Sequence, residues 1–110
     1  MSEITVGEVY NSWTTTLRCA IDLRDWYARI INGNGRDENT YNNHQVGVAR
    51  WCLEDMQGIV DACNAYYVVV RERGLALADY NDVNALWHRH VEIRTRFDDA
   101  LEGKPIDIDP

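Results

Sequence analysis

The stretch 41–74, YNNHQVGVARWCLEDMQGIVDACNAYYVVVRERG, decides the fold of this chain. Its apolar residues recur in steps of three and four, and they are Val48, Cys52, Met56, Ile59, Cys63, Tyr66 and Val70. That spacing places side chains on one face of an α-helix. A neighbouring set widens the stripe, and it comprises Ala49, Leu53, Val60 and Tyr67. A helix with so much apolar surface must be covered on more than one side, so the stretch predicts the central helix of a small bundle.

The ends of this helix carry recognisable signals. Three residues can cap its start, and they are Asn39, Thr40 and Asn42. Gly74 is expected to end the helix, since glycine readily adopts the conformation that follows a last helical turn. Gly47 and Gly58 lie inside the helix, where each costs about 1 kcal/mol relative to alanine. These two glycines would have a use where another backbone packs closely against them.

An earlier helix is predicted over residues 6–31. Thr5 and Glu8 have the spacing of a capping box, in which each side chain satisfies a backbone N–H of the first turn. The sequence NGNG at 32–35 predicts a turn after this helix. Its apolar stripe comprises Val9, Tyr10, Trp13, Leu17, Ala20, Ile21, Tyr27, Ile30 and Ile31.

A third helix is predicted after the central one. Asp79 or Asn81 is expected to cap it, and Gly103 with Pro105 is expected to end it. Its apolar stripe comprises Val83, Leu86, His90, Ile93, Phe97 and Leu101. The fold class is therefore all-α, a bundle of three long helices in a single domain over residues 1–103, followed by an acidic tail over 104–110.

Composition limits the partners of this domain. The chain has 110 residues and a formal charge of −7, of which −4 lies in residues 98–110. A basic groove for DNA or RNA is therefore not expected, and no apolar run is long enough to predict a membrane span. Four Trp and six Tyr exceed what one small bundle needs to bury, which predicts a homo-oligomer. We expect a soluble, cytoplasmic protein.

Catalytic and metal-binding patterns do not emerge from the sequence. His88 and His90 form HxH, but residues two apart on a helix point in different directions, and His90 lies on the apolar stripe. The three cysteines have no zinc-ligand spacing and are expected to be buried, reduced thiols. We expect no enzyme, no metal site and no cofactor.

Arginine and aromatic residues form the candidate functional set. The chain has ten Arg and one Lys, and arginine binds phosphate in a bidentate manner and stacks on rings. The candidate binding residues are Tyr10, Trp13, Arg24, Arg29, Arg71 and Arg73. Such a set can stack a base and hold a phosphate. The alternative is an aromatic core rimmed by solvated arginines that pair with Asp22, Asp25 and Glu72.

The overall plan resembles a family of small helical phage proteins, the second anti-CBASS type. These are oligomeric sponges that sequester cyclic oligonucleotide signals of bacterial immune systems. The resemblance lies in the length, in the segment VYNSW leading into LRDWYARIING, in a long helix ending near VVVRERG, and in DYNDVNAL opening the last helix.

The resemblance implies a hexamer that binds without catalysis in the host bacterial cytoplasm. A tyrosine matching Tyr10 would stack cyclic dinucleotides between paired protomers, with Arg24 or Arg29 in place of the lysine of the family. Cyclic trinucleotides would be held where three protomers meet, by Arg71 or Arg73, with Arg71 preferred.

Other functions remain open on the sequence. The acidic charge also suits a helical inhibitor that blocks a host protein partner by direct binding, since acidic surfaces can mimic nucleic acid. A structural or assembly component is a further alternative.

Overall fold

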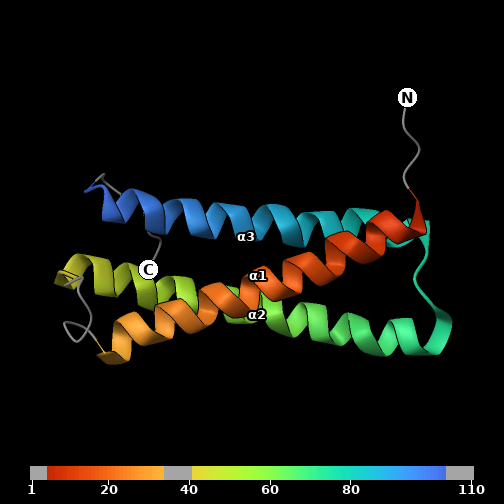
Figure 1. The fold of residues 1–110 in the computed structure, drawn as a ribbon, viewed down its shortest axis with the longest axis horizontal. Coiled ribbons are helices and arrows are strands. Elements are labelled where there is room, and N and C mark those ends of the chain that lie inside the picture. Colours follow the sequence, from red (N-terminus) through yellow and green to blue (C-terminus); the bar gives the residue numbers. More distant parts are fainter. Residues whose placement is uncertain (1–4, 34–40, 104–110) are drawn as a thin grey trace.

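Three long helices form in the order α1 (Val6–Gly33), α2 (Asn43–Arg73) and α3 (Tyr80–Leu101), as Figure 1 shows. This computed structural model describes residues 5–33 and 41–103. Each helix contacts the other two, so the predicted all-α three-helix bundle is confirmed. Helix α1 runs two residues beyond the predicted end at Ile31. Part of the predicted turn at 32–35 and the predicted tail at 104–110 lie outside the described residues.

Helix α2 buries the stripe that its sequence predicts. Its buried residues are Val48, Ala49, Cys52, Met56, Ile59, Val60 and Cys63. Towards the end of the helix the burial decreases, with Tyr66 and Val70 half-buried and Tyr67 54% exposed. The last two turns of α2 therefore have exposed apolar and aromatic side chains.

The helix ends follow the predicted capping chemistry. The Glu8 backbone N–H donates to Oγ1 of Thr5 at 3.2 Å. At the start of α2, the Gln45 N–H donates to Oδ1 of Asn42 at 2.8 Å, and Gln45 Oε1 accepts from the Asn42 N–H at 3.0 Å. Asn42 is therefore the cap, whereas Asn39 and Thr40 lie outside the described residues. Gly74 has φ +78°, a conformation that favours glycine and ends the helix as expected.

Asp79, one of the two predicted caps, occupies the N-cap position of α3, but its side chain does not cap that helix. A 3-10 turn, η1 (Leu77–Asp79), precedes α3, and the Asp79 side chain makes no capping hydrogen bond to that helix. Its carboxylate turns back instead and accepts from the Ala76 N–H at 2.9 Å and from the Tyr66 hydroxyl at 2.9 Å. Because the Asp79 carboxylate accepts hydrogen bonds from α2 and from the segment between α2 and α3, it does not accept one from the first turn of α3.

No backbone of the described residues packs closely against the two helical glycines. Gly47 and Gly58 are exposed, and a Cβ built on either would meet no described atom within 4 Å. The surface of α2 at both positions therefore has space for a methyl group.

Two polar side chains, those of Thr16 and His90, are buried in the core beside the apolar stripes. Thr16 is fully buried and its hydroxyl donates to the Ser12 carbonyl at 2.7 Å. His90 is buried on α3 as a core histidine, with Nδ1 at 3.0 Å from the Trp87 carbonyl. Because a carbonyl can only accept, Nδ1 carries the proton.

Within residues 5–33 and 41–103, no helix combines the length and the apolar character that a bilayer span requires.

Candidate functional site

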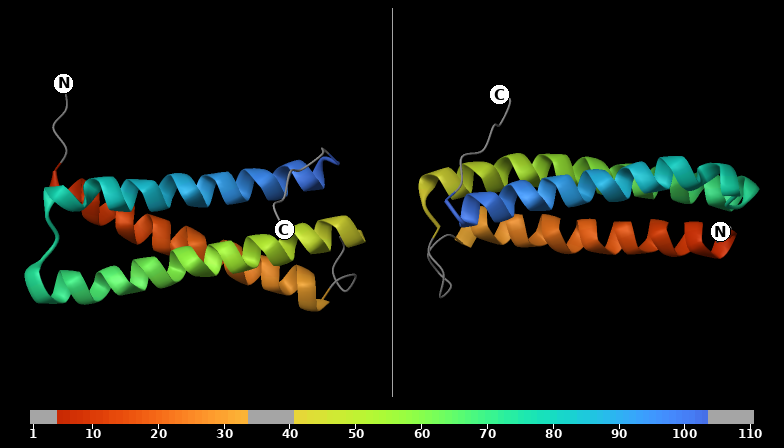
Figure 2. Two further views of the ribbon diagram at one scale, coloured as in Figure 1. Left: turned by 180° about the vertical axis from the view of Figure 1, so that it is seen from behind. Right: turned by 90° about the horizontal axis from the view of Figure 1, so that it is seen from above.

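One end of the bundle collects the start of α1, the end of α2 and the start of α3, as Figures 1 and 2 show. Five of the seven large apolar side chains that are exposed in the described chain belong to segments at this end: Val6, Tyr10, Tyr67, Val68 and Leu77. We call these five residues the end patch. Exposed apolar side chains are a common feature of binding and assembly surfaces.

Tyr10 and Trp13 have different surroundings although they are neighbours on α1. The Tyr10 ring is 52% exposed and meets the edge of the Trp13 ring, with centroids 5.9 Å apart. Trp13 is buried, and its indole N–H donates to the Cys63 carbonyl at 3.0 Å across the α1–α2 interface. Within the protomer Trp13 is thus a core residue, while Tyr10 has a ring accessible to a ligand.

Arg71 and Arg73 also differ, because only one of them makes an ion pair. The Arg71 guanidinium lies over the exposed Tyr67 ring, 5.8 Å from its centroid, and pairs with no described carboxylate. Arg73 forms a salt bridge with Asp79 at 2.7 Å. Arg71 therefore places a cation over a ring of the end patch, whereas Arg73 is held in its ion pair with Asp79.

Arg24 and Arg29 lie far from Tyr10 within one protomer. Arg24 is fourteen residues beyond Tyr10, about 21 Å along the helix. Its guanidinium is half-buried, hydrogen-bonded to Oδ1 of Asp25 at 3.1 and 3.2 Å and to Oε1 of Gln57 at 3.3 Å. Arg29 is exposed on another face of the helix. A site that joins Tyr10 to either arginine therefore requires a second chain.

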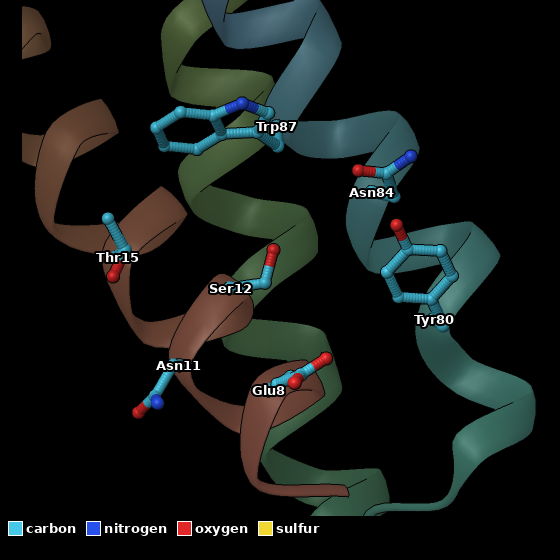
Figure 3. A pocket seen from close by; sticks show the side chains of 7 residues that line it. All are labelled: Glu8, Asn11, Ser12, Thr15, Tyr80, Asn84 and Trp87. Carbon is cyan, nitrogen blue, oxygen red and sulfur yellow. The ribbon is translucent and has the colours of Figure 1, made fainter. Parts of the chain in front are cut away.

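A groove between α1 and α3 was missed by the sequence reasoning. Its volume is about 340 Å³, and it is lined by Glu8, Asn11, Ser12, Thr15, Tyr80, Asn84 and Trp87 (Figure 3). The sequence does contain a signal for it, because these residues recur at steps of three and four beside the apolar stripes of both helices. Only the register between the two helices, which periodicity does not give, shows that the two rows face each other.

Two buried thiols and one buried imidazole complete the titratable groups of interest. Burial raises the pKa of Cys52 to about 12 and that of Cys63 to about 11, so both thiols are protonated and poor nucleophiles. Burial likewise lowers the pKa of His90 and keeps it neutral. Cys19 is half-buried rather than buried as expected.

Among residues 5–33 and 41–103, no group of three His, Cys, Asp or Glu side chains is placed to hold a metal ion. Comparison of the chain with protein-family models, with curated proteins and with solved structures gives no match. We therefore infer function from the residues and contacts above.

Proposed function

We propose that this protein is an oligomeric, non-catalytic binding protein that sequesters cyclic di- and trinucleotides, as the phage sponges that it resembles do. The observation that carries the proposal is the exposed Arg71 guanidinium over the ring of Tyr67, which belongs to the end patch. A ring offers stacking to any base, about 1–3 kcal/mol each, and a guanidinium offers paired N–H donors to a phosphate.

Symmetry would make this arrangement stronger than one exposed pair. If the end patches of several protomers pack together, each copy of Arg71 faces a shared centre that a cyclic oligonucleotide can occupy. Burial in such an interface strengthens every charge-assisted hydrogen bond to phosphate, because the effective dielectric constant falls. The proposal therefore requires an oligomer, and the exposed apolar residues Tyr67 and Val68 give the interface its driving force.

A second site of the same function would use the α1 helices of two protomers. Tyr10, Leu17 and Arg24 are seven residues apart and lie on one face of α1. Two such helices packed antiparallel about Leu17 would bring Tyr10 of one protomer beside Arg24 of the other. Arg29 lies on another face, so Arg24 is the better candidate for the phosphate of a dinucleotide.

The test is calorimetric titration of the protein with cyclic di- and trinucleotides and with linear trinucleotides of the same sequence. We expect tight binding of the cyclic compounds, a mass by light scattering that is a multiple of the protomer mass, and intact nucleotide on chromatography after incubation. Degradation of the nucleotide would show that the protein is an enzyme and would contradict the proposal of non-catalytic binding.

The variant Arg71→Ala should weaken trinucleotide binding by about a hundredfold, as removal of a buried charged contact does. Arg50→Ala is the matched control, since Arg50 is an exposed arginine near the opposite end of α2. Both variants should keep the wild-type circular dichroism and mass. Equal binding by Arg71→Ala and wild type would sink the assignment of Arg71.

The inhibitor alternative has its own supporting observation. Asp98 and Glu102 are exposed near the end of α3, next to the acidic residues 104–110. Under this reading a protein partner binds the acidic end and no cyclic nucleotide binds. Truncation after Gly103 separates the two functions, because it should abolish inhibition of a protein partner and leave nucleotide binding unchanged.

A further inference from the structure

The groove between α1 and α3 has an aromatic wall and a polar wall. Tyr80 and Trp87 lie two turns apart on α3, with Asn84 between them, and the Trp87 indole projects toward α1 (Figure 3). Glu8 and Ser12 of α1 are turned toward α3. A volume of about 340 Å³ is at the small end of the range for ligand sites.

Polar groups in this groove are left without partners. The side chains of Glu8, Ser12, Tyr80 and Asn84 make no hydrogen bond to any residue within 5–33 or 41–103. Ser12, Tyr80 and Asn84 are nevertheless half-buried. Half-buried polar groups usually form hydrogen bonds with protein, water or a ligand. The groove therefore offers free donors and acceptors for hydrogen bonds to a ligand.

The charge of the groove favours a ligand of one charge over the other. Glu8 is the one charged residue in the lining. His90 lies behind Trp87, with ring centroids 4.6 Å apart, and burial lowers its pKa, so it adds no cation at neutral pH. Arg89 is held by Asp55 at 3.2 Å. A phosphate or carboxylate would thus meet a negative site, whereas a cation would be attracted.

We propose that the α1–α3 groove binds a small planar organic cation of the amidinium or guanidinium class. The planar part of such a compound stacks on the Trp87 indole, the larger of the two rings, because one small group cannot contact two rings that lie two turns apart. The paired N–H donors of the compound match the two oxygens of the Glu8 carboxylate. The amide oxygen of Asn84 and the hydroxyl of Ser12 accept further N–H groups. The groove lies at the same end of the bundle as the end patch but shares none of its residues. Its charge preference is opposite, so the proposal does not rest on the proposed function.

Three compounds that share one ring and differ in charge test the proposal: benzamidine, benzamide and benzoate. We expect benzamidine to bind at least about tenfold more tightly than benzamide, and benzoate to give no signal. Titration followed by ¹⁵N NMR should move the backbone resonances of residues 8–15 and 80–87. Benzoate binding as tightly as benzamidine, or shifts confined to other residues, would overturn the proposal, as would the absence of benzamidine binding at millimolar concentration.

Two variants separate the roles of charge and ring. Glu8→Gln should reduce benzamidine affinity to that of benzamide, whereas Glu92→Gln, at an exposed position on α3, should leave both affinities unchanged. Trp87→Leu should weaken both compounds by a similar factor, because stacking does not depend on the amidine charge alone. If Trp87→Leu fails to fold, the Glu8→Gln result decides, and an unchanged preference for benzamidine in that variant would refute the proposal.

Discussion

Nη2 of Arg73 lies 2.7 Å from Oδ1 of Asp79, and Nη1 lies 3.1 Å from Oδ2, so the pair is bidentate. Asp79 is 4% exposed. Hydrogen bonds from Arg73 and from the Ala76 N–H hold the pKa of Asp79 well below its usual range. The pair closes the connection between α2 and α3, which gives Arg73 a structural task that its neighbour Arg71 does not have.

Removal of the Arg73 side chain should therefore lower stability. Arg73→Ala leaves the Asp79 carboxylate without its cation, and the melting temperature should fall by several degrees. Arg71→Ala, two residues earlier, should melt as the wild type does. Thermal denaturation followed by circular dichroism checks both variants. Equal melting temperatures for Arg73→Ala and wild type would show that the pair contributes nothing.

His90 should make the fold sensitive to mild acid. Its pKa is lowered in the folded protein, first by burial, so only the unfolded chain takes up a proton as pH falls through about 6.5. The stabilisation is thus complete above that pH and is lost below it, by at most about 2 kcal/mol at pH 5. Urea unfolding of wild type and His90→Leu at pH 7.5 and 5 measures this. A stability difference between the two proteins that does not change with pH would contradict the prediction.

Tyr27 should tolerate loss of its hydroxyl. The ring is fully buried against Phe97, with centroids 5.1 Å apart, and the only described group beside the hydroxyl that can bond to it is the Cys52 thiol, a weak partner outside normal hydrogen-bond geometry. Tyr27→Phe keeps the ring and removes a buried polar group, so stability should stay constant or rise by up to about 1 kcal/mol.

The matched control for Tyr27→Phe is Tyr66→Phe. The Tyr66 hydroxyl donates to Asp79 at 2.9 Å, so its loss should cost about 1 kcal/mol. Urea denaturation measures both variants. A loss from Tyr27→Phe as large as that from Tyr66→Phe would mean that the Tyr27 hydroxyl has a stronger partner than the Cys52 thiol.

Gly58→Ala should stabilise the protomer. Gly58 is exposed, with space for a methyl group, in the middle of α2, where alanine is favoured over glycine by about 1 kcal/mol. Urea unfolding at low protein concentration measures the gain. If a second chain packs against this glycine, the added methyl group instead lowers the mass seen by light scattering.

Local signals in the sequence were sufficient for the helices. Residues such as Val48, Cys52 and Met56 recur with helical spacing and are buried. Asn42 caps the start of α2 with its side chain, and Gly74 ends the helix with a positive φ. These signals act over one or two turns. They therefore survive in any packing arrangement and can be predicted from the chain alone.

Contacts between helices were less accessible to prediction. Asp79 was expected to cap α3, but a bidentate arginine six residues earlier competes for its carboxylate. Trp13 was a candidate for stacking on a base. Its indole N–H instead donates to the backbone carbonyl of Cys63, fifty residues later in the chain. The groove residues Glu8 and Asn84 came together only through the register of α1 against α3. Periodicity specifies which face is buried and not what lies opposite.

Because the bundle has three helices, the start of α1 and the end of α3 lie at opposite ends, which matters for labelling the protein. Helix α1 starts at the end of the bundle where Tyr67 and Arg71 lie, and α3 ends at the other, about 33 Å away along its 22 residues. A purification tag or fluorophore joined ahead of Val6 would thus crowd the very surface under study. One joined after Gly103 leaves from the far end, so surface immobilisation and labelling are best done through a carboxyl-terminal handle.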